Sequence, residues 1–122
     1  MTLRAAWLGF ALAAGCAGNG DDLSGDWIGT WSSTVANGTV TESLSQSGDQ
    51  VEGTAAFTGT SCWNAAQLSL VISGANLSGS ALAGEIRADM SATWTADHIV
   101  GTFDILTAGT CDGTGTFALD HQ

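Results

Sequence analysis

The chain has almost no positive charge. Its 122 residues contain two cations, Arg4 and Arg87, against twelve carboxylates, and the formal net charge is −10. Nucleic-acid binding draws its affinity from clustered Lys and Arg, and adhesion to anionic lipid through a basic patch needs the same residues. The composition therefore argues against both partners, whereas an acidic surface favours encounters with basic proteins.

Proline and tyrosine are absent, and histidine is rare. Proline cannot donate a hydrogen bond within a sheet and is therefore confined to edge strands. Because the chain has none, every candidate strand can occupy a central position. Neither His98 nor His121 has a spaced metal-ligating partner, and His121 falls in the tail that follows the last predicted strand. No calcium loop and no nucleophile motif occurs in the sequence. We therefore predict a protein that is not an enzyme and that uses neither a metal nor a cofactor.

The first sixteen residues have the pattern of an export signal. Arg4 precedes an apolar run at residues 5–14, which Gly15 and Cys16 follow. A bilayer-spanning helix needs roughly twenty apolar residues, so this shorter run indicates a signal peptide. Its removal leaves a chain long enough for one domain and too short for two.

The end of this segment resembles a lipobox, the motif of bacterial lipoproteins. Residues 12–16 read Leu-Ala-Ala-Gly-Cys, with Leu12 one position earlier than is usual. The resemblance implies that Cys16 is lipidated and anchors the exported protein to a membrane of the cell envelope. Ala17 implies the outer membrane if the cell is Gram-negative. The alternative is an ordinary secretory signal that is cleaved nearby.

These features divide the chain into three parts. We predict a signal peptide at residues 1–15, a lipidated cysteine with a polar tether at 16–24, and one domain at 25–120. If Cys16 carries lipid, Cys62 and Cys111 remain as an even pair in an oxidising compartment, which favours a disulfide. Closing a loop of about fifty residues would stabilise the domain by roughly 4 kcal/mol. The alternative is two buried free thiols.

Short alternating segments, separated by glycine, asparagine and aspartate, predict an antiparallel meander of eight strands. Asn37-Gly38 and similar pairs supply the turns. The predicted strands span residues 26–34, 38–46, 51–58, 65–73, 77–83, 85–94, 98–106 and 113–119.

A glycine followed by a hydroxyl residue recurs within five of these strands. Glycine weakens a strand unless the sheet bends there or a neighbour approaches closely. The repeat therefore favours a curved sheet that closes into an eight-stranded barrel, with a two-sheet sandwich as the alternative. The motif begins at Gly29, Gly53, Gly79, Gly101 and Gly115.

Side chains alternate along a strand, so parity assigns the faces of the sheet. One face is apolar and the other is rich in hydroxyls and carboxylates. We predict that the apolar face points inward and the polar face outward. A membrane-spanning barrel needs an apolar outer band, so we expect a barrel that does not cross a membrane. The predicted inward residues are Trp27, Gly29, Trp31, Val40, Leu44, Val51, Phe57, Leu68, Leu70, Ile72, Leu77, Met90, Trp94, Ile99, Phe103, Ile105, Phe117 and Leu119.

The start of the domain resembles the calycins, which include lipocalins and avidins. Gly25-Asp26-Trp27 and Gly29-Thr30-Trp31 are similar to the Gly-x-Trp signature of their first strand. Residues 23–27 also resemble the opening of small bacterial barrel inhibitors of metalloproteases. The likeness implies a barrel over residues 25–119 that binds a small ligand or a protein. The absence of tyrosine argues against a biotin site of the avidin type.

The strongest candidates for a ligand site are inward aromatic residues and one carboxylate. Trp27, Trp31, Trp94 and Phe103 either line a pocket or simply fill the barrel. Parity also places Glu42 on the apolar face. Its carboxylate there either recognises a cationic or hydrogen-bonding group of a ligand, or remains hydrated near a barrel opening or a bulge.

The two loop cysteines bear on where a ligand would enter. Cys62 and Cys111 belong to connections that emerge at the same end of the meander, and a bridge across that end would close it. A ligand would then enter at the opposite end, unless Trp63 beside Cys62 is itself a contact. We predict an anchored module that binds a small apolar or amphipathic molecule. The alternatives are a barrel that binds or inhibits a protein, basic proteins included, and a purely structural envelope lipoprotein.

Overall fold

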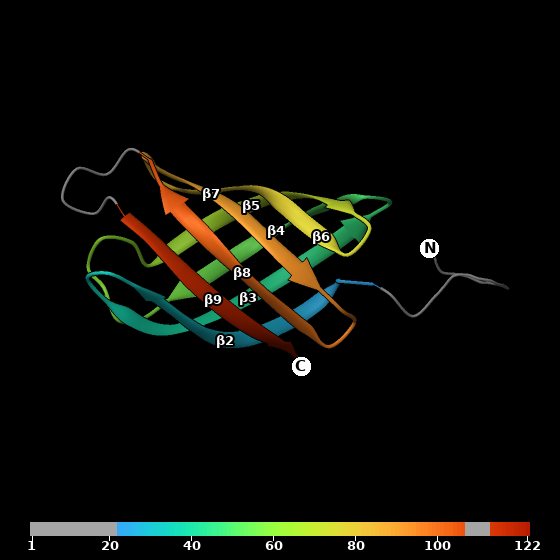
Figure 1. The fold of residues 1–122 in the computed structure, drawn as a ribbon, viewed down its shortest axis with the longest axis horizontal. Coiled ribbons are helices and arrows are strands. Elements are labelled where there is room, and N and C mark those ends of the chain that lie inside the picture. The colour runs from blue at the N-terminus through green and yellow to red at the C-terminus, as the bar shows by residue number, and fades with distance from the viewer. Residues whose placement is uncertain (1–21, 107–112) are drawn as a thin grey trace, which may run out of the picture.

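The computed structural model describes residues 22–106 and 113–122, which form a closed barrel of eight antiparallel strands (Figure 1). This confirms the predicted fold, and every predicted strand end lies within two residues of the observed one. No helix in the described part of the chain is long and apolar enough to span a membrane. The strands are β2 (Gly25–Ser33), β3 (Asn37–Ser47), β4 (Gln50–Phe57), β5 (Ala65–Ser73), β6 (Asn76–Ala83), β7 (Ile86–Trp94), β8 (His98–Ile105) and β9 (Gly113–His121).

Each strand pairs with the next one along the chain, and β9 closes the barrel by pairing with β2. Figure 1 shows the first and last of these strands side by side. The closing ladder runs from Trp27 opposite His121 to Ser33 opposite Gly115. With this ladder in place, no strand of the sheet is left with an unpaired edge.

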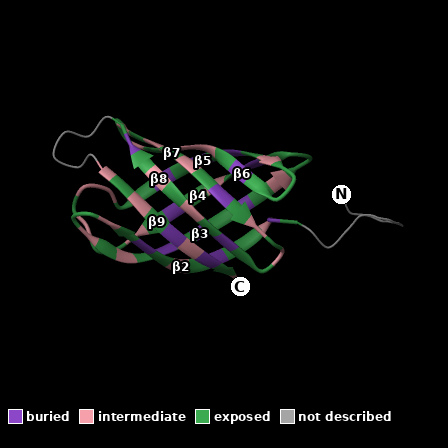
Figure 2. Ribbon diagram, in the orientation of Figure 1, coloured by how far each residue is buried: buried purple, intermediate pink, exposed green. Residues whose placement is uncertain are grey.

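The two faces of the sheet are those that parity predicts. Buried and exposed residues alternate along the strands (Figure 2). All eighteen residues predicted to point inward are buried or half-buried, whereas hydroxyls such as Thr39, Thr54 and Thr116 are exposed. The apolar interior is therefore the core of the molecule, and the polar face is its surface.

The repeated strand glycines let neighbouring backbones approach closely, as the motif predicts. A Cβ atom on Gly29 would lie 1.8 Å from the carbonyl oxygen of Ala118, and one on Gly53 would lie 2.0 Å from that of Ser43. At Gly115 the obstacle includes the ring of Phe103, whose Cζ atom would be 2.3 Å away. Such contacts exclude any side chain at these positions, which is how glycine permits a tightly curved sheet.

The barrel has two distinct ends. We call the end with the connections 34–36, 58–64 and 84–85 the Trp63 end. The opposite end has the connections 48–49, 74–75 and 95–97, together with the start of β2 and the finish of β9, and we call it the His121 end.

Side chains fill the half of the barrel near the His121 end. Leu23 is fully buried there, Trp27 is 1% exposed, and the indole Nε1 of Trp27 donates a 2.9 Å hydrogen bond to the carbonyl oxygen of Leu23. The backbone nitrogen of Leu23 in turn donates to the side chain of Gln46 on β3. The packed domain therefore includes Leu23, which the sequence had assigned to the tether, and His121, which it had assigned to a tail.

Candidate functional site

An apolar cavity occupies the other half of the barrel, toward the Trp63 end. Its volume, as space open to the centres of water-sized molecules, is about 60 Å³, enough for several waters. Glu42 is the only polar side chain among the described residues that line it. The lining consists of Trp31, Val40, Glu42, Phe57, Trp63, Ala66, Leu68, Ala81, Ala83, Ile86, Ala88, Met90, Phe103, Ile105 and Phe117.

Small side chains explain why this half is hollow. Ala66 on β5, Ala81 and Ala83 on β6, and Ala88 on β7 all line the cavity, and Ala81 lies directly opposite Ala88 in the ladder. The interior of an eight-stranded barrel is just wide enough for ordinary side chains to fill it. Alanine on three adjacent strands therefore leaves a space that larger residues would occupy.

Aromatic residues form the other wall of the cavity, around Trp31. The ring of Trp31 lies 5.4 Å from that of Trp63 and 6.4 Å from those of Phe57 and Phe103, measured between centroids. Its indole Nε1 donates a 2.9 Å hydrogen bond to the carbonyl oxygen of Thr58, which satisfies its polar atom and fixes its position. The apolar faces of the cluster are thus held in place beside the empty space.

Glu42 lies where the hollow half meets the filled half. It is the lining residue of β3 nearest the His121 end, and its register partners are Trp27 on β2 and Ala55 on β4. The residue is only 7% exposed, and burial raises the pKa of its carboxyl to about 7. No described residue forms a hydrogen bond or an ion pair with this carboxyl.

The structure brings three of the five predicted ligand residues together. Trp31, Glu42 and Phe103 line the cavity. Trp27 belongs instead to the filled half, and Trp94 lies at the His121 end, where its indole Nε1 donates to the carbonyl oxygen of Gly74. These two tryptophans pack the barrel and do not contact the cavity.

The cavity lies at the end that carries Cys62, not at the opposite one. Trp63, which the sequence left open as a ligand contact at this end, lines the cavity and touches the aromatic cluster. At the opposite end, Leu23, Trp27 and His121 fill the space. The bridge itself stays a prediction, since Cys111 lies outside the described residues, as does Cys16.

Parity could have identified the small inward residues that line the cavity, although not their level along the barrel. The inward positions of β6 and β7 include Ala81, Ala83 and Ala88, which share a face with Leu77 and Met90. The sequence prediction names inward aromatic residues as ligand contacts and does not include the alanines that leave the space.

Other polar pairs in the described residues lie outside the cavity. The Nδ1 atom of His98 is 2.7 Å from a carboxylate oxygen of Asp120 on the barrel surface. Within residues 22–106 and 113–122, no group of three or more His, Cys, Asp or Glu side chains is arranged to hold a metal ion.

The chain matches no protein-family model, and no curated protein matches it with significance. The function must therefore be inferred from the site itself.

Proposed function

We propose that this barrel binds one small apolar or amphipathic molecule in the cavity at the Trp63 end. The observation that carries the proposal is the contrast between the two halves of one interior. Near the His121 end the large side chains of Leu23 and Trp27 are buried in the interior, whereas near the Trp63 end alanines leave an apolar space of about 60 Å³. An apolar lining with one polar group is the composition that small-molecule sites usually have, and the small volume restricts the ligand to few atoms.

The wall of the cavity supports this role. An empty core cavity costs stability because its lining loses contacts, and a molecule with an apolar body would restore them. Trp31 and Trp63 offer flat aromatic surfaces to such a body. Lining residues at the outer end of the cavity, such as Phe57 and Ile86, are only half-buried.

The proposal includes the location of the protein. We propose that an export signal and a lipid on Cys16 hold the barrel at the cell envelope, as the N-terminal sequence implies. Incorporation of labelled palmitate tests this part independently. Label in the wild-type protein and none in a Cys16→Ser variant would support it, whereas equal labelling or none in either protein would contradict it.

Binding can be tested by calorimetry with benzene, a neutral apolar probe of few atoms. We expect saturable binding by the wild-type protein. An Ala88→Leu variant fills the cavity and should abolish this binding. The matched control is Ala56→Leu, which adds the same atoms to an exposed position on the outer face of β4.

The outcomes separate the functions that the sequence left open. Binding that Ala88→Leu removes and Ala56→Leu preserves supports a ligand site in the cavity. If no probe binds, or if both variants bind like the wild type, the cavity is not the site. A protein-binding or structural role would then explain the barrel better.

A further inference from the structure

The carboxyl of Glu42 is buried at the inner end of the cavity and has no partner among the described residues. A buried polar group without a hydrogen bond is costly, and native proteins rarely keep one without a reason. Nothing in the packing requires a carboxyl at this position, because its neighbours in register are Trp27 and Ala55. The carboxyl therefore indicates a ligand group that donates the missing hydrogen bond.

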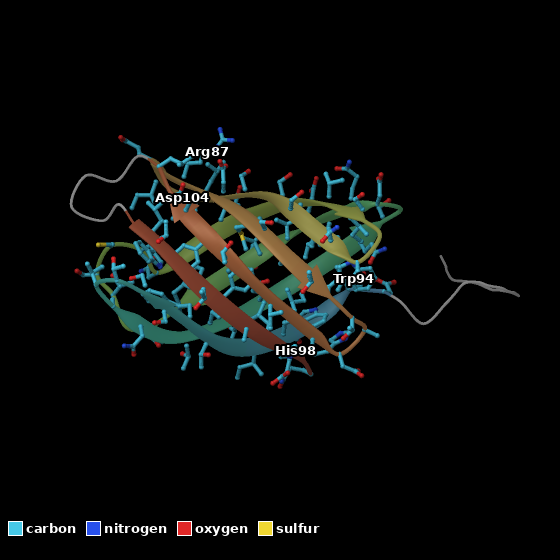
Figure 3. All side chains as sticks on the ribbon, in the orientation of Figure 1. Arg87, Trp94, His98 and Asp104 are labelled. Atoms are coloured by element: carbon cyan, nitrogen blue, oxygen red, sulfur yellow. The ribbon has the colours of Figure 1, made fainter. Side chains whose placement is uncertain are left out.

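The surroundings restrict the charge of that group. The one arginine in the described residues, Arg87, lies on the outer face of β7, 3.5 Å from Asp89 (Figure 3). No cation lines the cavity within the described part of the chain. An anionic ligand would meet a carboxyl at the inner end and an acidic protein around it, and both disfavour its entry.

The same charges favour the entry of a cationic ligand. The acidic chain attracts it to the surface. Inside the cavity, the Glu42 carboxylate can accept a charge-assisted hydrogen bond. Trp31 and Trp63 can contact an apolar body or, through their ring faces, the cation itself. Glu42 is only 7% exposed in the folded protein, so ligand binding adds mainly the desolvation of the cation.

We propose that the cavity selects a protonated amine with an apolar body, whose ammonium group donates a hydrogen bond to the Glu42 carboxylate while the body packs against Trp31. This inference rests on the proposed function and names the class of ligand for the same site.

Three probes of equal chain length test the selection. Hexylamine, 1-hexanol and hexanoate carry a cationic, a neutral and an anionic group on the same apolar body, and calorimetry at pH 8 gives their affinities for the purified protein. We expect hexylamine to bind at least about tenfold more tightly than 1-hexanol, because both can donate a hydrogen bond to the carboxylate but only the ammonium also brings a positive charge to it. Hexanoate should bind most weakly.

Two carboxylate variants identify the group responsible. Glu42→Gln keeps the shape of the side chain and should remove the preference for hexylamine over 1-hexanol. Glu52→Gln is the matched control, since Glu52 is exposed on the outer face of β4. It should leave all three affinities unchanged. Binding of 1-hexanol also shows that the Glu42→Gln variant is folded.

The failures are distinguishable. If hexylamine and 1-hexanol bind equally, or if hexanoate binds best, amine selection is wrong and the cavity remains a ligand site. The same conclusion follows if Glu42→Gln keeps the preference for hexylamine. If none of the three probes binds the wild-type protein, both amine selection and the proposed function are contradicted.

Discussion

The indole ring of Trp27 and the imidazole ring of His121 stack face to face, 4.2 Å apart and 7° from parallel. Nδ1 of the imidazole lies 2.8 Å from the carbonyl oxygen of Ala96, and Nε2 lies 3.1 Å from that of Ser24. Each contact is a hydrogen bond when that nitrogen carries a proton. His121 thus joins the last strand to the first strand, to the segment before it and to the β7–β8 connection.

A His121→Ala variant should lose a large part of the stability of the domain. Ring stacking contributes about 1 kcal/mol and each hydrogen bond a similar amount, so we expect a loss of about 2 to 3 kcal/mol in the free energy of unfolding by urea. His98→Ala is the control, because His98 pairs with Asp120 on the surface, where such pairs contribute little. Equal losses in the two variants would show that His121 does not close this end.

Glu42 should make stability depend on pH. Its pKa rises from 4.5 to about 7 on burial, so the folded protein holds this proton more tightly than the unfolded chain. The stabilising effect is complete below pH 4.5 and is lost as the pH rises through 7. The wild-type protein should therefore lose about 3 kcal/mol relative to Glu42→Gln between pH 4 and pH 8. Urea unfolding at both pH values measures this, and the other carboxylates cancel in the comparison. A difference that stays constant across this range would contradict the assignment.

The strand glycines should tolerate no side chain where a neighbouring backbone abuts them. In Gly29→Ala the new Cβ would meet the carbonyl oxygen of Ala118, so we expect a loss of about 3 kcal/mol or more, or failure to fold. Gly48→Asn is the control. Gly48 has a positive φ of 62° with open space around it, and asparagine adopts that conformation readily. Comparable stability of the two variants in thermal unfolding would show that the close approach at Gly29 is unimportant.

Reduction should destabilise the domain if Cys62 and Cys111 are bridged. The loop-closure argument gives a loss of about 4 kcal/mol, and Cys62→Ser and Cys111→Ser should each produce the same loss without any further effect of a reductant. Because Cys62 adjoins Trp63, the same variants should also weaken binding in the cavity. If reductant leaves the urea midpoint of the wild-type protein unchanged, the bridge is absent or carries no stability.

The strands and their faces could be predicted from the sequence because the information is local. Apolar and polar residues alternate with a period of two, which assigns the faces of each strand. Glycine or asparagine at the turns marks the strand ends. Both assignments use only a residue and its neighbours in the sequence. The predicted strand at residues 65–73 coincides with β5, for example. The glycine motif likewise predicted closure from a single local rule.

The position of the cavity could not be predicted in the same way, because it depends on the register between strands. Ala81 and Ala88 make a space only because they lie opposite one another and at the same level as Ala66 and Trp31. The closed end depends on residues beyond the obvious strands. The sequence predicts Trp27 as a pocket residue, but in the structure it bonds to Leu23 and stacks on His121.

The measurement that tests the central claim most directly is native mass spectrometry of the protein isolated from the cells that make it. We predict that the wild-type barrel and the Ala56→Leu control each carry one small bound molecule, which dissociates on activation in the gas phase, and that Ala88→Leu is empty. An empty wild-type protein would contradict the claim that the cavity is a binding site. A molecule retained equally by Ala88→Leu would place the binding site elsewhere.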